Sequence, residues 1–167
     1  MIKYVDKKIF ALGIVLLLSV FLSRQIQVIV HYDTFDNIQP QGATTLYYNN
    51  GNGFEEDDSV YSNIEENQVK YTFTPCFFVS GIRIIPTRDP EQTVYLESIE
   101  VSIDNVTVKS FDSEEIYRNI IQEQSEAVVV SKGETVQVQY KDSESGPYVT
   151  FSRDFLIAVN SMTYMTI

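Results

Sequence analysis

The sequence is poor in the residues that most metal centres and nucleophilic active sites require. Its 167 residues include one cysteine, Cys76, and one histidine, His31. A single cysteine cannot form a disulfide within the chain. One histidine and one cysteine cannot supply the usual zinc ligand sets or a histidine-activated nucleophile. The composition therefore argues against a zinc enzyme and against histidine-dependent covalent catalysis.

Basic residues are also scarce. The chain has 12 lysines and arginines against 23 aspartates and glutamates, which gives a formal net charge of -11. Lys3, Lys7, Lys8 and Arg24 lie at the amino terminus, so the remainder is more acidic still. A body of this charge repels the phosphates of nucleic acids, and we expect no nucleic-acid partner.

What the sequence does contain is a long apolar run near its start. Residues 9–23, IFALGIVLLLSVFLS, carry no charge and lie between Lys8 and Arg24. A helix of this length spans roughly 22 Å, and snorkelling of the flanking cations can cover the rest of a hydrocarbon core of roughly 30 Å. No small-x-small cleavage pattern follows, which favours an uncleaved single-pass anchor. A cleaved signal peptide and a buried core helix are the alternatives.

The charge around this run gives the chain a predicted orientation. Lysines before an apolar segment keep that end in the cytoplasm. We predict that residues 1–24 form a cytoplasmic tip and a membrane anchor. Residues 25–167 are then an extracytoplasmic domain held at the cell membrane.

The rest of the chain has the pattern of short β-strands. Its segments are rich in β-branched and aromatic residues and end at Asn, Gly, Pro or Asp. We predict a hairpin over 99–109 with its turn at Asp104-Asn105, and strands at 25–32, 43–49, 68–74, 80–86, 127–130, 135–140, 148–152 and 155–159. Turn signals about every ten residues are typical of an antiparallel sandwich or barrel, so the predicted fold class is an all-β, antiparallel β-sandwich.

Two segments need separate interpretation. Residues 112–124 predict one short helix, because Asp112 or Ser113 can cap it and Ile116, Ile120 and Ile121 fall on one face. Residues 155–167 carry no charge and are interpreted as a final strand pair in the core. The alternative is that the chain stops just before a further membrane span.

Four motifs, in order and spacing, carry a resemblance to a known family. They are LYYNNGNGFEEDDS (46–59), VKYTFT (69–74), IRIIPTRDP (82–90) and LESIEVS (96–102). The chain resembles the jelly-roll-like β-sandwich modules attached to bacterial membrane proteins and glycosyltransferases of cell-surface polysaccharide synthesis. It departs from their pattern where 84–86 delay the Arg-Asp-Pro element. The resemblance implies an extracytoplasmic accessory domain without catalytic activity.

Carbohydrate binding follows as a hypothesis from the same resemblance. Sugar recognition uses flat aromatic faces flanked by amides, carboxylates and arginine, and the chain has 11 tyrosines but no tryptophan. On this hypothesis the ligand-binding residues are Tyr48, Asn50, Asn52, Arg83 and Asp89. The alternative is that the tyrosines are ordinary half-buried strand residues, and it applies to Tyr47, Tyr71, Tyr95, Tyr140 and Tyr148.

The loop that follows Tyr48 contains glycines and then acidic residues. Gly51 and Gly53 permit positive φ in a tight reversal, and we expect Phe54 to fold back into the end of the core. Glu55, Asp57 and Asp58 are candidate ligands for Ca²⁺, the one cofactor considered. A solvated acidic turn is the favoured alternative, because the spacing does not match the helical calcium loop.

Three functions remain open. The first is a membrane-anchored accessory module that binds glycan in cell-envelope polysaccharide synthesis or assembly. The second is a non-catalytic ectodomain that docks on a membrane protein partner. The third is a glycosidase-like enzyme, which the scattered carboxylates neither single out nor exclude; we expect no enzyme.

Overall fold

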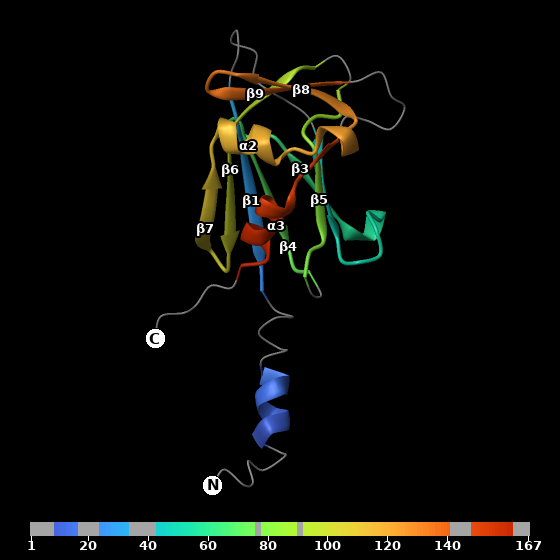
Figure 1. The fold of residues 1–167 in the computed structure, drawn as a ribbon, viewed down its shortest axis with the longest axis vertical. Helices are drawn as coiled ribbons and strands as arrows, with labels where there is room; N and C mark the ends of the chain where they lie inside the picture. The colour runs from blue at the N-terminus through green and yellow to red at the C-terminus, as the bar shows by residue number, and fades with distance from the viewer. Residues whose placement is uncertain are drawn as a thin grey trace.

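The computed structural model describes residues 9–16, 24–33, 43–75, 78–89, 92–140 and 148–161. About half of these residues form two antiparallel sheets packed face to face (Figure 1). The prediction of an all-β, antiparallel sandwich is therefore confirmed.

The larger sheet has six strands and the smaller has four. The larger runs in the order β4 (Gln68–Phe73), β1 (Ile26–Tyr32), β6 (Val94–Ile103), β9 (Thr135–Tyr140) and β8 (Ala127–Lys132), with β7 (Val106–Phe111) also paired to β6. The smaller runs in the order β10 (Val149–Thr150), β5 (Gly81–Ile85), β2 (Ala43–Asn49) and β3 (Ser59–Asn63). Strand β3 lies in a segment for which the sequence predicted no strand.

Alternating apolar and polar residues give each sheet one apolar face, and the apolar faces of the two sheets pack against each other. In β4, Val69, Tyr71 and Phe73 are buried while Gln68 and Lys70 are exposed, which is the period of two that a half-buried strand requires. The two inner faces meet in one core. Across it Tyr48 of β2 stacks on Phe73, with the ring centroids 4.5 Å apart.

The hairpin predicted over 99–109 is confirmed. Strands β6 and β7 pair antiparallel, and Asp104 and Asn105 between them have φ values of 50° and 65°. Positive φ at both turn positions is the type I′ geometry that suits a two-residue hairpin. Since β6 is ten residues long, its start pairs with β9 and its end with β7, which lets one strand support two neighbours on the same edge.

The predicted strand at 155–159 is wrong, because this segment is helical. Helix α3 (Arg153–Val159) starts after Ser152, and its buried residues are Phe155, Ala158 and Val159. Their i, i+3, i+4 spacing is that of one helix face, and the five-residue apolar run alone did not separate it from a buried strand. Residues 162–167 lie outside the described residues.

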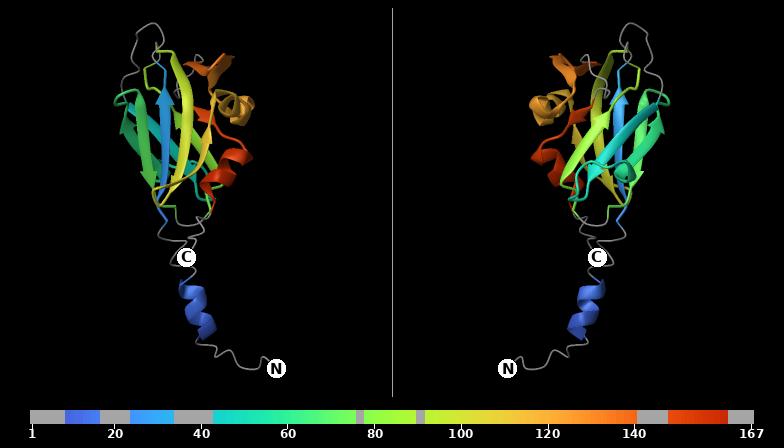
Figure 2. Two further views of the ribbon diagram at one scale, coloured as in Figure 1. Left: turned by 90° about the vertical axis from the view of Figure 1, so that its left-hand side faces the viewer. Right: turned by 90° about the vertical axis from the view of Figure 1, so that its right-hand side faces the viewer.

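The helix predicted over 112–124 is confirmed but shorter. Helix α2 (Ser113–Asn119) begins with Asp112 as its cap, whose side chain accepts a hydrogen bond from the backbone N–H of Glu115 at 2.8 Å. It ends because Ile120 bridges to Phe151, and the 3-10 turn η3 (Gln122–Gln124) follows. Figure 2 shows α2 and α3 together on one side of the sandwich.

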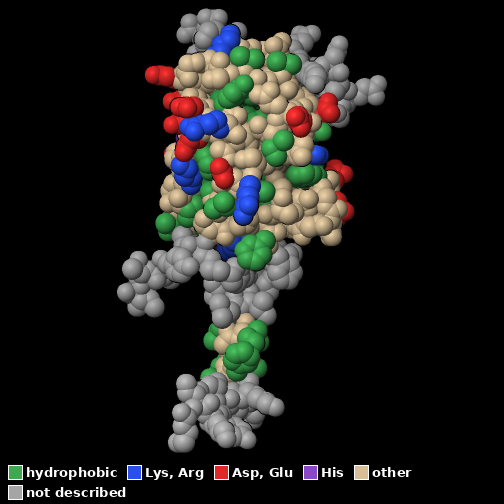
Figure 3. Space-filling view, in the orientation of Figure 1, with side chains coloured by type: hydrophobic (Ala, Val, Ile, Leu, Met, Phe, Trp, Pro, Cys, Tyr) green, Lys and Arg blue, Asp and Glu red, His purple; other side chains and the backbone are tan. Residues whose placement is uncertain are grey.

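The predicted anchor, 9–23, lies only partly within the described residues. Residues 9–16 are helical and stand apart from the sandwich (Figure 1), and apolar side chains cover this helix in Figure 3. Ile9 is 65% exposed and Phe10 is 66% exposed. Within the described ranges, no helix combines the length and the apolarity needed to cross a membrane. Cys76 lies outside these ranges.

Because two tyrosines are buried, we expect the protein to lose stability at alkaline pH. Burial raises the pKa of both Tyr32 and Tyr71. The Tyr32 hydroxyl donates to the carbonyl oxygen of Pro86 at 3.2 Å. Within the part of the chain that the structure describes, no hydrogen bond of good geometry reaches the Tyr71 hydroxyl, although the hydroxyls of Tyr32 and Thr44 lie near it.

A tyrosine whose pKa is higher in the folded state than in the unfolded state, where it is about 10, contributes to the free energy of unfolding. This contribution is complete below pH 10 and is lost as the pH rises through the folded-state pKa. We expect the free energy of unfolding to be flat from pH 8 to about 9.5 and to fall above about 10. Tyr71→Phe should weaken this fall while leaving stability at pH 7 nearly unchanged. Urea unfolding at a series of pH values measures it, and an identical alkaline slope in the variant would contradict the assignment.

Candidate functional site

The loop between β2 and β3 is built around the side chain of Asn49. Its Oδ1 accepts hydrogen bonds from the backbone N–H groups of Gly51 at 2.7 Å and Gly53 at 3.0 Å. The two glycines have φ values of 108° and 106°, a conformation that other residues rarely adopt. The Asn/Gly sequence therefore stabilises a tight reversal of the chain, and this reversal determines the position of the next residue, Phe54.

Phe54 lands on the outer face of the four-stranded sheet and not in the core, so the expectation for this residue is wrong. A Cβ atom placed on Gly81 of β5 would lie 2.8 Å from Cζ of Phe54. The ring can rest there only because Gly81 has no side chain. In the right-hand view of Figure 2 the loop lies against the strands of this sheet.

Arg83 lies between two aromatic rings on this outer face. Its guanidinium carbon is 4.1 Å from the centroid of Phe54 and 4.4 Å from that of Tyr148. Its Nε is buried and has no hydrogen-bond partner within the described residues. Tyr47 pairs with Arg83 across the strands, and together with Ile85 these residues line a cavity of about 230 Å³.

A second arginine, Arg88, lies on the same face. It contacts Thr45, the outward-facing residue of β2 that comes two positions before Tyr47. Arg88 donates through Nη2 to Oγ1 of Thr45 at 2.9 Å, and its guanidinium carbon is 4.9 Å from the ring centroid of Tyr61. Thr45 pairs with both Tyr61 and Ile85, which sets Arg88 beside the cavity of Arg83. We call the surface formed by Tyr47, Phe54, Tyr61, Arg83, Arg88 and Tyr148 the arginine–aromatic face.

Tyr47 connects the two arginines. Burial raises the pKa of Tyr47, and the nearby hydroxyl of Tyr61 raises it further, while the charge of Arg88 acts in the opposite direction. Tyr47 therefore keeps its proton at neutral pH and can donate or accept a hydrogen bond. None of the ion pairs within the described residues involves Arg83 or Arg88. Among the described residues, the face thus offers two guanidinium groups without a carboxylate partner and with aromatic rings beside each.

The five residues predicted to bind ligand do not come together. Arg83 lies on the arginine–aromatic face, whereas Tyr48 faces inward against Phe73. Asn50 donates from Nδ2 to Oδ1 of Asp58 at 2.9 Å, and Asn52 is exposed in the loop. Asp89 lies in the turn after β5, where its N–H donates to Oγ1 of Thr87 at 3.1 Å.

The predicted calcium ligands lie in the loop between β2 and β3. Glu55, which precedes the 3-10 turn η2 (Glu56–Asp58), and Asp57 within that turn are both exposed, while Asp58 accepts a hydrogen bond from Asn50. The described residues contain no group of three or more His, Cys, Asp or Glu side chains placed to hold a metal ion. A calcium site in this loop stays a prediction from the sequence, as does its alternative, a solvated acidic turn.

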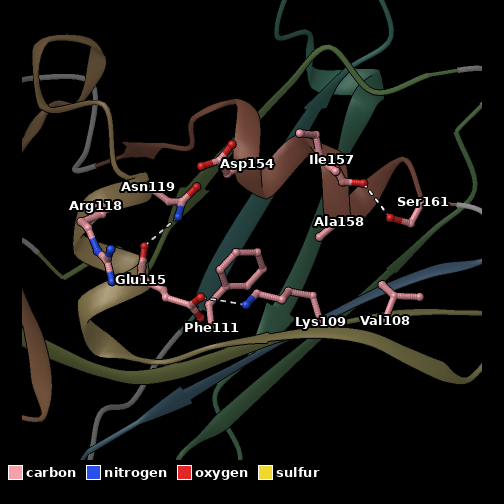
Figure 4. A pocket seen from close by; sticks show the side chains of 10 residues that line it. All are labelled: Val108, Lys109, Phe111, Glu115, Arg118, Asn119, Asp154, Ile157, Ala158 and Ser161. Carbon is pink, nitrogen blue, oxygen red and sulfur yellow. Dashed lines mark hydrogen bonds and ion pairs between the residues drawn. The ribbon is translucent and has the colours of Figure 1, made fainter.

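A larger concavity, the helix groove, lies between β7, α2 and α3 (Figure 4). Its volume is about 510 Å³, and it is lined by Val108, Lys109, Phe111, Glu115, Arg118, Asn119, Asp154, Ile157, Ala158 and Ser161. Lys109 Nζ contacts Glu115 Oε1 at 2.7 Å, and Arg118 Nη2 contacts Glu114 Oε1 at 3.3 Å. In Figure 3 charged side chains of both signs gather along this side of the molecule.

The charges decide between the two concavities. Both cations of the helix groove already have carboxylate partners, and a ligand would have to displace these before it could pair with them. The two arginines of the arginine–aromatic face have no such partners within the described ranges. We therefore take the arginine–aromatic face, although it is the smaller cavity, as the candidate site.

Sequence reasoning missed most of this site. Phe54, Tyr61, Arg88 and Tyr148 come from four segments that only the strand register brings together. One local signal was available for β2: Leu46 is apolar, and the strand period of two turns Tyr48 to the same face and Tyr47 to the opposite one. The parity of this strand therefore selects Tyr47, and not Tyr48, as the outward aromatic residue.

Comparisons with known proteins add no relative: no protein-family model, no curated protein and no solved structure matches this chain. The resemblance to modules of cell-surface polysaccharide synthesis stays a prediction from the sequence motifs. A function has to be inferred from the geometry of the arginine–aromatic face and the organisation of the chain.

Proposed function

We propose that this protein is a membrane-anchored, extracytoplasmic accessory module that binds carbohydrate in cell-envelope polysaccharide synthesis or assembly. The arginine–aromatic face is its binding site, and the protein performs no covalent chemistry. We also propose that its sandwich is of the jelly-roll-like kind that the sequence motifs indicate. Residues 9–23 are the proposed membrane anchor, since an uninterrupted apolar run between Lys8 and Arg24 is the export pattern.

The observation that carries the proposal is Arg83, held between the rings of Phe54 and Tyr148. A sugar presents apolar C–H faces and hydroxyl edges. Aromatic rings offer the matching apolar surface, and a guanidinium supplies several N–H donors in a fixed plane. A small cavity with an apolar lining and a few well-placed polar groups is the usual form of a small-ligand site.

The first test is glycan binding by the full chain in lipid nanodiscs, on an array of cell-surface oligosaccharides. We expect Arg83→Met to lower affinity at least tenfold, because it keeps an unbranched stem between the rings but removes the charge and every donor. Gly81→Ala should lower affinity several-fold with Arg83 intact, since the added Cβ displaces the ring of Phe54.

Lys70→Met is the matched control for the lost charge. Lys70 is exposed on the outer face of the other sheet, so this variant should bind like the parent chain. Absence of binding to every glycan, or equal binding by the parent and Arg83→Met, would overturn the proposal. Far-UV circular dichroism of each variant checks that the fold is retained.

A protein-docking function is the second candidate, favoured by strand β8. This strand is an edge of the larger sheet, and it exposes Val128 by 45% and Val130 by 42%. An unpaired edge with apolar side chains is a surface to which a partner can add a strand. A chain that binds no glycan but loses a membrane-protein partner on Val128→Lys would support this function.

A further inference from the structure

We infer that the ligand of the arginine–aromatic face is an acidic glycan, in which isolated carboxylates of uronic-acid type are spaced along an otherwise neutral chain. The inference rests on the proposed carbohydrate-binding function and specifies its ligand class. Arg83 and Arg88 are the residues that recognise the carboxylate, and Phe54, Tyr61 and Tyr148 orient them.

The environment of Arg83 favours an anionic ligand group over a neutral hydroxyl group. Its Nε is buried and unpaired, and none of the ion pairs within the described residues includes this guanidinium. A partly buried cation without a counter-charge is unfavourable. A carboxylate supplies that counter-charge through hydrogen bonds about twice as strong as neutral ones, and a sugar hydroxyl does not.

The stacking also restricts where a partner can bind. Ring centroids lie 4.1 Å and 4.4 Å from the guanidinium carbon of Arg83, so the two rings cover part of the guanidinium and limit how an additional group can approach its plane. All guanidinium N–H groups lie in that plane, where they match the two oxygens of a carboxylate. Because the rings hold the plane before binding, less side-chain entropy is lost on complex formation.

Arg88 extends the site along β2. Its anchor Thr45 is two residues before Tyr47, the strand partner of Arg83, and two residues of a strand span roughly 7 Å. The hydrogen bond to Thr45 and the ring of Tyr61 hold this second guanidinium in place. A ligand lying along the strand can therefore meet both arginines and the Tyr47 hydroxyl between them.

The net charge of the protein favours a ligand with widely spaced anionic groups over a densely charged one. The chain carries a formal net charge of -11, and Glu56 lies close enough to act on Tyr47. This field repels a polymer with a charge on every unit. Two local cations are sufficient for a carboxylate that has neutral sugars on either side.

The test compares three probes on the full chain in nanodiscs. They are an oligosaccharide alternating glucuronate with N-acetylglucosamine, the same oligosaccharide with its carboxyl groups reduced to alcohols, and inorganic polyphosphate. We expect carboxyl reduction to weaken binding at least tenfold. Arg83→Lys should weaken binding to the glucuronate probe by a similar factor, because it keeps the charge and loses the planar fork. Polyphosphate should bind more weakly than the glucuronate probe.

Each other outcome has a definite meaning. Equal binding of the acidic and reduced oligosaccharides, both lost in Arg83→Met, would overturn this inference and leave the proposed function standing. Tighter, Arg83-dependent binding of polyphosphate would overturn the preference for spaced carboxylates. Failure of all three probes to bind, together with a blank array, would overturn the proposed function as well. Lys70→Met is again the control.

Discussion

Replacing Phe155 by alanine is expected to lower the free energy of unfolding by about 3–5 kcal/mol. Phe155 is 1% exposed, and its ring centroid is 4.3 Å from that of Phe151 and 5.0 Å from that of Phe111. The variant loses the transfer free energy of a large aromatic side chain and leaves a cavity that its neighbours fill only in part. Because a domain is stable by only about 5–15 kcal/mol, this is a large share of the total.

Urea unfolding of the full chain in mild detergent, followed by far-UV circular dichroism, measures this change. Ile157→Ala is the control within the same helix: Ile157 is 56% exposed, and the expected change is within about 0.5 kcal/mol. Similar effects of the two substitutions would mean that α3 is not packed into the sandwich as described.

The second large effect is expected at Asn119, whose alanine variant should be less stable by about 2–3 kcal/mol. Asn119 is 8% exposed and joins α2 to α3. Its Oδ1 accepts hydrogen bonds from the backbone N–H of Phe155 at 3.1 Å and the hydroxyl of Ser152 at 2.8 Å. Its Nδ2 donates to the carbonyl oxygen of Glu115 at 2.8 Å.

The physical reason is that α3 has no side-chain cap of its own. Ser152 stands at its N-cap position but makes no capping hydrogen bond, so Asn119 takes over an N–H that the helix itself cannot satisfy. Removing Asn119 leaves several buried polar groups unpaired. The same urea measurement applies, with Arg118→Ala as control, because the exposed Arg118–Glu114 pair should contribute less than about 1 kcal/mol.

The predictions that succeeded depend on neighbours in sequence. The type I′ turn at Asp104-Asn105 and the cap at Asp112 are set by a few adjacent residues, and the sequence predicts both. Alternation fixes most strands for the same reason. The short apolar run 155–159 shows the limit, since only the packing of Phe155 against Phe111 and Phe151 favours a helix there.

Individual residues of the candidate site could be identified from the sequence, but the residues that contact them in space could not. It selected Arg83 but chose Tyr48 in place of Tyr47 and placed Phe54 in the core. Contacts between β2 and β5, or between Phe54 and Gly81, join positions far apart along the chain. Such a contact depends on strand register, and a shift of one residue turns every side chain to the opposite face.

The amino-acid sequence by itself determined the acidic charge, the scarcity of metal-binding residues, the apolar run at 9–23 and the antiparallel β character, because each follows from composition or from local periodicity. Only the tertiary structure decided which face of the smaller sheet carries the site. It placed the rings of Phe54 and Tyr148 next to the guanidinium of Arg83. The pairing of β10, β5 and β2 sets that placement, and such long-range pairing leaves no trace in a local pattern.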